Sequence, residues 1–184
     1  MKTPPDSQPG GQPAFSGATA PQRVGQRAAL KKILVPIDFT TASLVALEYA
    51  ASLATPFGGT VHLLHVLEPH GVVARSGNLE PRGLQEQTAR AQAKFRLLIE
   101  RFWPPSVPVE TCVDSGMVAF DIVRAADNVG SDLIILTTHD LRSVKHLISR
   151  HVAEWVMRDT PCPVLFVQSP NPVALDLGPE PEPR

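Results

Sequence analysis

The sequence predicts an α/β fold in which a parallel sheet carries helices on both faces. Five short apolar runs rich in Val and Ile alternate with four segments whose apolar residues follow helical spacing. Each run is bounded by glycine, proline or a capping hydroxyl residue. Strands that alternate with helices pair in parallel through right-handed crossovers, so these observations indicate a doubly wound sheet. In such sheets ligands bind at the carboxyl ends of the strands, where the strand order reverses.

The sequence predicts a helix between the first two strands. Residues 32–38 form an apolar run that ends in a carboxylate, and three hydroxyl residues that favour a helix N-terminus follow it closely. The helix then stops at Pro56, and residues 60–69 form the second buried run. The predicted apolar stripe of this helix is Leu44, Leu47, Ala51 and Ala54.

The middle of the chain predicts a loop, a helix and an edge strand. Residues 70–83 contain three glycines and read as a loop, and the helical pattern of 85–102 ends before Pro104. Residues 108–116 alternate apolar and polar positions, which is typical of a strand at the edge of a sheet. The apolar stripe predicted for the helix is Thr88, Ala91, Phe95, Leu98 and Phe102.

The last third adds two helices and two strands. A helix is predicted over 119–129, and the most continuously apolar strand follows at 131–138. A second helix is predicted over 143–159, with Trp155 on its apolar stripe, and a final strand over 163–168 ends the pattern.

Composition separates one folded domain from two tails. The chain has 184 residues, 43% of them apolar, which is ordinary for a soluble globular protein. Ten of the 19 prolines fall within residues 1–28 and 169–184, where no apolar periodicity accompanies them. Such segments bury too little surface to offset the entropy of ordering them, so we expect disordered tails around one domain at 29–168.

Charge and cysteine usage narrow the class of function. A net charge of −1 provides no basic excess for a nucleic-acid or membrane partner. The N-terminus shows no apolar signal run, so the expected compartment is the cytoplasm. Cys112 and Cys162 lie far apart and read as reduced thiols, and His62 and His65 would point to opposite faces of a strand. We therefore expect no metal site, and we find no catalytic set in the sequence.

Several segments resemble the universal stress protein family: the first strand and helix, TVHLLHVLEP, the Gly116 turn, and above all SDLIILTTHD followed by VAEWVMRDTPCPVLFV. The resemblance implies a Rossmann-like sheet in the order 3-2-1-4-5. It also implies a homodimer that meets along the last strand. The interface residues would be Pro163, Val164, Leu165, Phe166 and Val167.

Family members that bind ATP share a motif of Gly, two residues, Gly, nine residues, then Gly with Ser or Thr. Such glycines let backbone amides approach phosphate oxygens closely. At that spacing this chain carries Thr137, Asp140 and the pair Arg150–His151, so all three glycines are replaced. The Asp140 carboxylate would repel phosphate, and Arg150 would fill space that a nucleotide needs.

Other positions that resemble the family's nucleotide site are retained. Asp38 stands where the family's adenine-contacting aspartate stands, and Val66 and Leu136 stand at positions that flank the base and ribose. An aspartate at the end of the first strand can equally cap the next helix. The candidate nucleotide-binding set is Pro36, Ile37, Asp38, Val66, Leu136, Thr137, Asp140, Arg142, Arg150, His151 and Val152.

We therefore expect a regulatory, stress-response homodimer that acts through contacts with other proteins, is not an enzyme and uses no cofactor. The alternative is a nucleotide-binding stress protein that holds ATP or AMP with the basic segment 139–151. There Arg142, Lys145 and Arg150, with three imidazoles, would replace the glycine amides. The segment can also be read as a solvated, mildly basic helix face.

Overall fold

A computed structural model describes residues 29–68, 81–138, 150–169 and 173–178. The loop expected at 70–83 and the start of the helix expected at 143–159 fall mostly outside these residues. The described elements are β1 (Lys32–Pro36), α1 (Thr41–Ala54), the short 3-10 helix η1 (Thr55–Phe57), β2 (Thr60–Leu67), α3 (Pro81–Phe102), β3 (Val109–Ser115), α4 (Val118–Val129), β4 (Leu133–Thr138), α5 (Arg150–Asp159) and β5 (Val164–Gln168).

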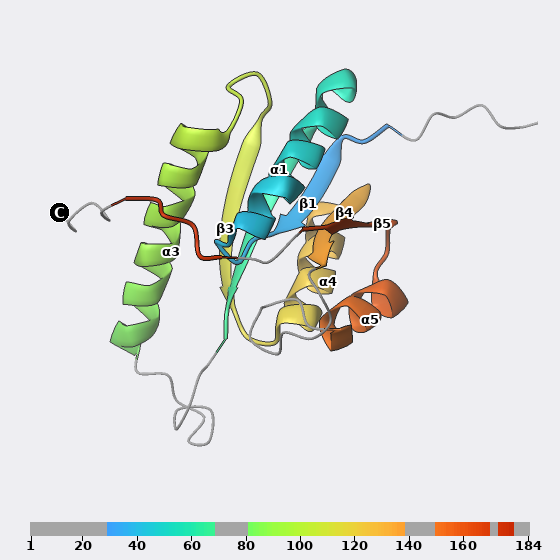
Figure 1. Cartoon of the computed structure of the whole chain (residues 1–184). Helices are drawn as coiled ribbons and strands as arrows, with labels where there is room; N and C mark the ends of the chain where they lie inside the picture. The colour runs from blue at the N-terminus through green and yellow to red at the C-terminus, as the bar shows by residue number, and fades with distance from the viewer. Residues whose placement is uncertain (1–28, 69–80, 139–149, 170–172, 179–184) are drawn as a thin grey trace, which may run out of the picture.

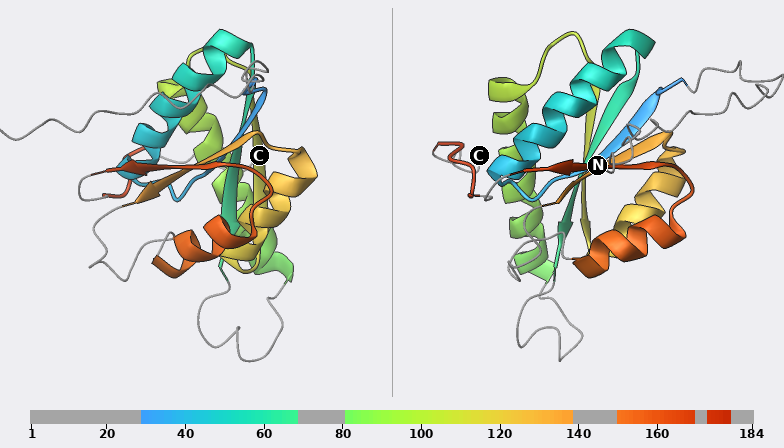
Figure 2. Two further views of the ribbon diagram at one scale, coloured as in Figure 1. Left: turned by 90° about the vertical axis from the view of Figure 1, so that its right-hand side faces the viewer. Right: turned by 45° about the vertical axis from the view of Figure 1, so that its right-hand side comes forward.

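The sheet confirms the predicted architecture. Its five strands are parallel and lie in the order β3-β2-β1-β4-β5, so the predicted edge strand is at an edge. Helices α1 and α3 cover one face, and α4 and α5 cover the other (Figures 1 and 2). The strand order reverses between β1 and β4, which are neighbours in space but far apart in sequence. The carboxyl ends of these two strands are therefore the expected place for a site.

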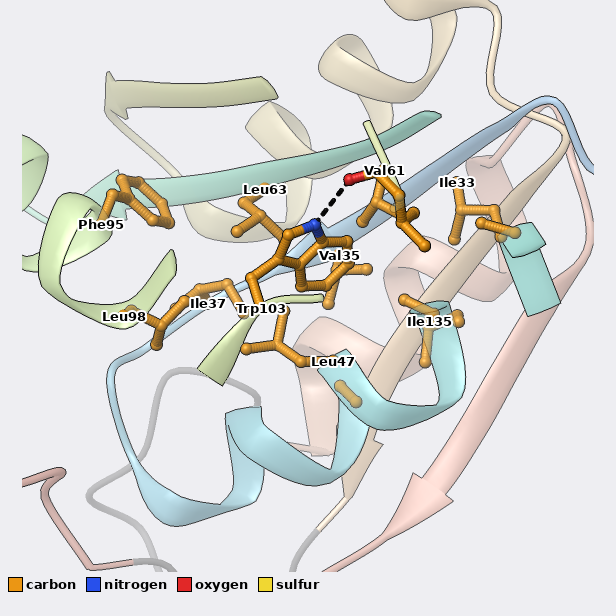
Figure 3. Packing of buried hydrophobic residues seen from close by; sticks show 14 of the residues in the cluster. Ile33, Val35, Ile37, Leu47, Val61, Leu63, Phe95, Leu98, Trp103 and Ile135 are labelled. Atoms are coloured by element: carbon orange, nitrogen blue, oxygen red, sulfur yellow. Dashed lines mark hydrogen bonds between the residues drawn. The ribbon is translucent and has the colours of Figure 1, made fainter. Parts of the chain in front are cut away.

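Alternation along the strands divides the core into two clusters. Ile33 and Val35 of β1 face α1 and α3, whereas Leu34 between them faces α4 and α5. On the α1 side, the buried Trp103 packs among these side chains and donates its indole N–H to the carbonyl of Val107 at 2.8 Å (Figure 3). Two covered faces explain why the strands read as nearly continuous apolar runs.

Helix α3 differs from the sequence prediction at both ends. It begins at Pro81, four residues before the expected start, because proline is tolerated in the first turn, where its missing N–H has no partner to lose. At its C-terminus Phe102 leaves the predicted buried stripe and is 41% exposed, whereas Leu98 is fully buried. One turn of α3 therefore extends past the cover that the core provides.

The C-terminal tail also differs from the prediction. Residues 173–178 were expected to lie in a disordered segment, but Thr40 and Ala174 form an antiparallel bridge, and Leu175 and Leu177 pack against the core on the α1 side. We call residues 173–178 the C-terminal strap. In this segment leucine alternates with small or polar residues, so that both leucines can face the core. This pattern was missed in the sequence because the tail is rich in proline.

The described residues were also examined for membrane-spanning helices, disulfides and metal-ligating clusters. Within them, no helix is long and apolar enough to cross a membrane. Cys112 and Cys162 are free thiols, and no group of three or more metal-ligating side chains is found in the part of the chain that the structure describes. His62 and His65 lie on opposite faces of β2, as the spacing predicted.

Burial along α3 makes a direct prediction. Leu98→Ala removes a fully buried side chain and should lower the free energy of unfolding by about 2–5 kcal/mol. The matched control Phe102→Ala, one turn further along, should cost less than about 1 kcal/mol because its side chain is already 41% exposed. Urea denaturation measures both values, and equal losses would contradict the placement of the two side chains.

Candidate functional site

Asp38 fastens the end of β1 to the start of α1. Its Oδ1 accepts hydrogen bonds from the Thr40 amide at 3.0 Å, the Thr40 hydroxyl at 2.6 Å and the Ser43 hydroxyl at 2.8 Å. The side chain is half-buried. The carboxylate thus stabilises the turn into α1 by accepting bonds from Thr40, the residue before the helix, and from the Ser43 hydroxyl, while its contact with adenine stays a prediction.

Phe39 gives this turn its unusual backbone. With φ at +57°, it is the one described residue other than glycine in the left-handed region, a conformation that costs about 1–3 kcal/mol when the surroundings enforce it. Its ring is buried beside His65, with 4.7 Å between ring centroids, and beside Phe95, at 5.1 Å. The Lys94 ammonium lies 5.6 Å from the Phe39 centroid. Aromatic packing therefore holds the left-handed conformation in place.

His65 joins the same turn from β2. Its Nδ1–H donates to the Ile37 carbonyl at 2.7 Å, an acceptor-only group, so the neutral ring carries its proton on Nδ1. Burial lowers the pKa of His65, against a smaller opposing effect of this hydrogen bond. The imidazole is thus a neutral structural donor beneath the β1–α1 turn.

A pocket opens on the other side of the same sheet edge. Its volume is about 540 Å³, a size suited to a small-molecule ligand. It lies between the end of β2, the turn after β3 and the starts of α4 and α5, and we call it the α4–α5 pocket. Its lining residues are Glu68, Gly116, Met117, Val118, Ala119, His151, Val152 and Trp155.

The start of α4 contributes backbone polarity to this pocket. Met117 is the residue before the helix, and it provides no side-chain hydrogen bond to the first turn. The first amides of a helix have no acceptor within the helix and carry a partial positive charge. Because Val118 and Ala119 line the pocket, this helix start faces it. The remaining lining is largely apolar, with Glu68 as its carboxylate.

An ion-paired brace fixes the turn at Gly116. The Arg124 guanidinium lies 2.7 Å from Asp121 and also pairs with Asp114 at the end of β3. Asp121 is buried, its Oδ2 has no hydrogen-bond partner among the residues that the structure describes, and burial raises the pKa of its carboxyl group. A Cβ on Gly116 would come within 2.5 Å of this Oδ2. Gly116 thus allows the chain to pass against the brace on its way into α4.

The structure describes nine of the eleven sequence candidates. Pro36, Ile37, Val66 and Leu136 are buried in the sheet, so their side chains build the core. Asp38 and Thr137 lie at strand ends, and Thr137 is only 4% exposed. His151 and Val152 line the α4–α5 pocket. Asp140 and Arg142 lie outside the described residues, and Arg150 is the first residue of α5.

Six lining residues of the α4–α5 pocket were absent from the sequence candidates, among them Glu68, Met117 and Trp155. Glu68 directly follows β2, and Met117 directly follows the Gly116 turn, so both were open to prediction from their places at strand ends. Trp155 was assigned to packing, and it is half-buried against the core while also reaching the pocket.

The interface residues expected from the sequence lie on or next to β5, the outermost strand on one side of the sheet. Pro163 is exposed and precedes β5, while Val164, Leu165 and Phe166 are half-buried. Val167 is buried within the core on the α1 side. The described chain places no further strand beyond β5, so an apolar strand edge is available there.

Known proteins match this chain in sequence and in overall fold. The model of the Universal stress protein family matches residues 29–168. The chain belongs to the universal stress protein family. Universal stress protein MJ0531 of Methanocaldococcus jannaschii is 29% identical over 145 residues, which cover 77% of this chain and 84% of that protein.

Solved structures of the universal stress protein family agree with the fold. Protein MJ0577 of the same archaeon gives a TM-score of 0.65 at 26% identity, and the match covers 78% of this chain and 99% of that one. A universal stress protein from Archaeoglobus fulgidus, solved in complex with dAMP, gives a TM-score of 0.53 at 22% identity and covers 75% of this chain and 98% of its own. At this level of identity the second match shows the shared fold.

The brace makes a stability prediction for Gly116. Gly116→Ala should destabilise the protein by about 1–3 kcal/mol, since its Cβ would meet the Asp121 carboxylate and its φ of +156° disfavours a side chain. Gly83→Ala is the matched control: it lies in α3 with open space around it and should be neutral or stabilising by up to about 1 kcal/mol. Thermal unfolding of both variants decides the matter, and equal shifts would contradict the close approach.

The buried histidines predict a pH dependence. Burial lowers the pKa of His65 and of His62 from 6.5 in the folded protein, so the unfolded chain binds more protons as the pH falls. Their contribution to stability is present above pH 6.5 and is lost as the pH falls below it. His65→Gln should therefore flatten the fall in unfolding free energy between pH 7 and pH 5. A slope equal to that of the parent chain would show that His65 does not titrate with unfolding.

Proposed function

We propose that this universal stress protein is a regulatory, stress-response protein that acts through contacts with other proteins and does not bind ATP in the usual way. The observation that carries the proposal is that side chains occupy all three positions where the family's phosphate motif has glycine. At the first of them, Thr137 is the second-last residue of β4 and is buried. A Cβ and hydroxyl thus stand where close backbone approach to phosphate requires bare glycine.

The β1–α1 turn supports the same proposal. One oxygen of the Asp38 carboxylate already accepts three hydrogen bonds from the start of α1. A base that recruited this oxygen would compete with bonds that stabilise the turn. Oδ1 is therefore committed to the turn, and Oδ2 would have to accept the amine of a base.

A homodimer through β5 completes this proposal. The half-buried Val164, Leu165 and Phe166 leave part of their apolar surface in solvent along an edge that has no strand partner within the described residues. Pairing with the same strand of a second copy would satisfy the edge backbone groups and cover these side chains. No catalytic step enters this proposal.

Calorimetric titration with ATP tests the nucleotide part. The parent chain should show no binding at micromolar ATP, whereas a variant that restores the motif glycines and serine (Thr137→Gly, Asp140→Gly, Arg150→Gly, His151→Ser) should gain binding. Micromolar binding by the parent chain that Asp38→Ala abolishes would contradict the proposal.

Sedimentation tests the dimer part. The parent chain should sediment as a dimer at micromolar concentration, and Leu165→Glu should shift it to monomer while circular dichroism confirms that it stays folded. The control Ser106→Glu, in the exposed turn before β3, should leave the dimer intact. A parent chain that sediments as a monomer would overturn the assembly proposed here.

The α4–α5 pocket favours a second candidate function. A ligand-sized cavity lined by His151 and by the start of α4 could hold a nucleotide with its phosphates on side chains of the basic segment 139–151. In that case Arg142→Ala or Lys145→Ala should weaken binding of ATP or AMP about tenfold each, while Asp140→Gly should strengthen it. If neither change alters the calorimetric titration, the second candidate is excluded.

A further inference from the structure

The C-terminal strap attaches to the β1–α1 turn through its backbone. The Thr41 amide donates to the Val173 carbonyl at 2.7 Å, and the Leu175 amide donates to the Phe39 carbonyl at 2.9 Å. The Val173 amide also donates to the Thr41 hydroxyl at 3.1 Å. These bonds flank the bridge between Thr40 and Ala174. The strap thereby satisfies an amide of the first turn of α1, which has no acceptor within the helix.

Side chains anchor the strap further along. Leu175 and Leu177 are half-buried against the core on the α1 side, whereas the residues next to them are exposed. This alternation is typical of an extended segment with one face on the core. The Arg101 guanidinium of α3 donates to the Asp176 carbonyl at 3.2 Å. The Asp176 carboxylate then accepts the Gly178 amide at 3.0 Å, and Gly178 ends the strap with φ at +80°. Figure 1 shows the strap, in red, passing from the start of α1 across α3.

The strap closes one side of the carboxyl edge of the sheet. It holds the carbonyl of Phe39 and the amide of Thr41, which frame the left-handed turn next to Asp38. The α4–α5 pocket, on the opposite face of the sheet, is lined by none of these residues. A ligand can therefore approach this edge from the α4–α5 side while the strap covers the α1 side.

We propose that residues 173–178 are an intramolecular lock that keeps the β1–α1 turn in its left-handed conformation. The groove between the start of α1 and α3 is then a binding groove for an extended segment with leucine at alternate positions, and the chain's own strap fills it. Release of the strap removes three hydrogen bonds from the turn and uncovers the groove. The proposal does not depend on whether nucleotide binds.

Hydrogen exchange of the full chain tests the lock. In the parent chain the amides of Thr41 and Leu175 should both be protected. Leu175→Asp combined with Leu177→Asp places two carboxylates against the core and should release the strap, which speeds exchange at Thr41 about tenfold or more. The control Val173→Asp changes a side chain that is 63% exposed and should leave exchange at Thr41 unchanged.

A peptide in trans tests the groove. A fluorescent peptide with the sequence of residues 171–178, NPVALDLG, should bind the full-length double variant and slow exchange at Thr41 again, whereas the parent chain should not bind it. The proposal is overturned if the Leu175 amide of the parent exchanges at the rate of a free peptide. It is equally overturned if the folded double variant keeps parental protection at Thr41 and does not bind the peptide.

Discussion

The turn from β1 into α1 is the constraint on which the rest of the structure depends. Its backbone takes a left-handed step at Phe39, a conformation that costs energy and persists because four groups hold it: the Asp38 carboxylate, the His65 and Phe95 rings, and the C-terminal strap. The turn sits where the strand order reverses, at the centre of the sheet edge. Contacts from α1, β2, α3 and the tail therefore converge on one residue.

This convergence gives the two faces of the sheet different roles. On the α1 side, polar groups are bonded to one another and apolar groups are packed, so the edge is closed. On the α4–α5 side, an arginine brace and a glycine turn hold the start of α4 against an open pocket. The closed α1 side and the side chains in the phosphate motif both support the proposal that the protein acts through contacts with other proteins.

The sequence predicted the architecture because the spacing of apolar residues indicates which faces of helices and strands are buried, and glycine, proline and capping residues indicate where these elements end. The parallel sheet with helices on both faces, the edge position of β3 and the opposite faces of His62 and His65 followed from these patterns, whereas the strand order was implied by the resemblance to the universal stress protein family. The strap could not be predicted in the same way. Its two leucines lie among prolines, and only the groove formed by distant residues such as Arg101 makes them stabilising.

The candidate site was predictable in part. Positions at strand ends, such as Asp38, were identified from the pattern, but their partners depend on hydroxyl groups that the turn brings within reach. Candidates such as Leu136 and Val66 are buried beneath α4 and α5, and their contact with a ligand stays a prediction. The pocket residues Glu68 and Met117 could be predicted one by one from their places after strands, but only the three-dimensional meeting of their segments shows that they line one pocket.

One measurement tests the central claim that the α1 side of this edge is closed to nucleotide. Amide chemical shifts of the full chain are followed by nuclear magnetic resonance during a titration with ATP. The account predicts that the amides of residues 38–41 do not move at micromolar ATP. Saturable shifts of those amides in that range would contradict it, because they would place the nucleotide against the turn that Asp38 and the strap hold closed.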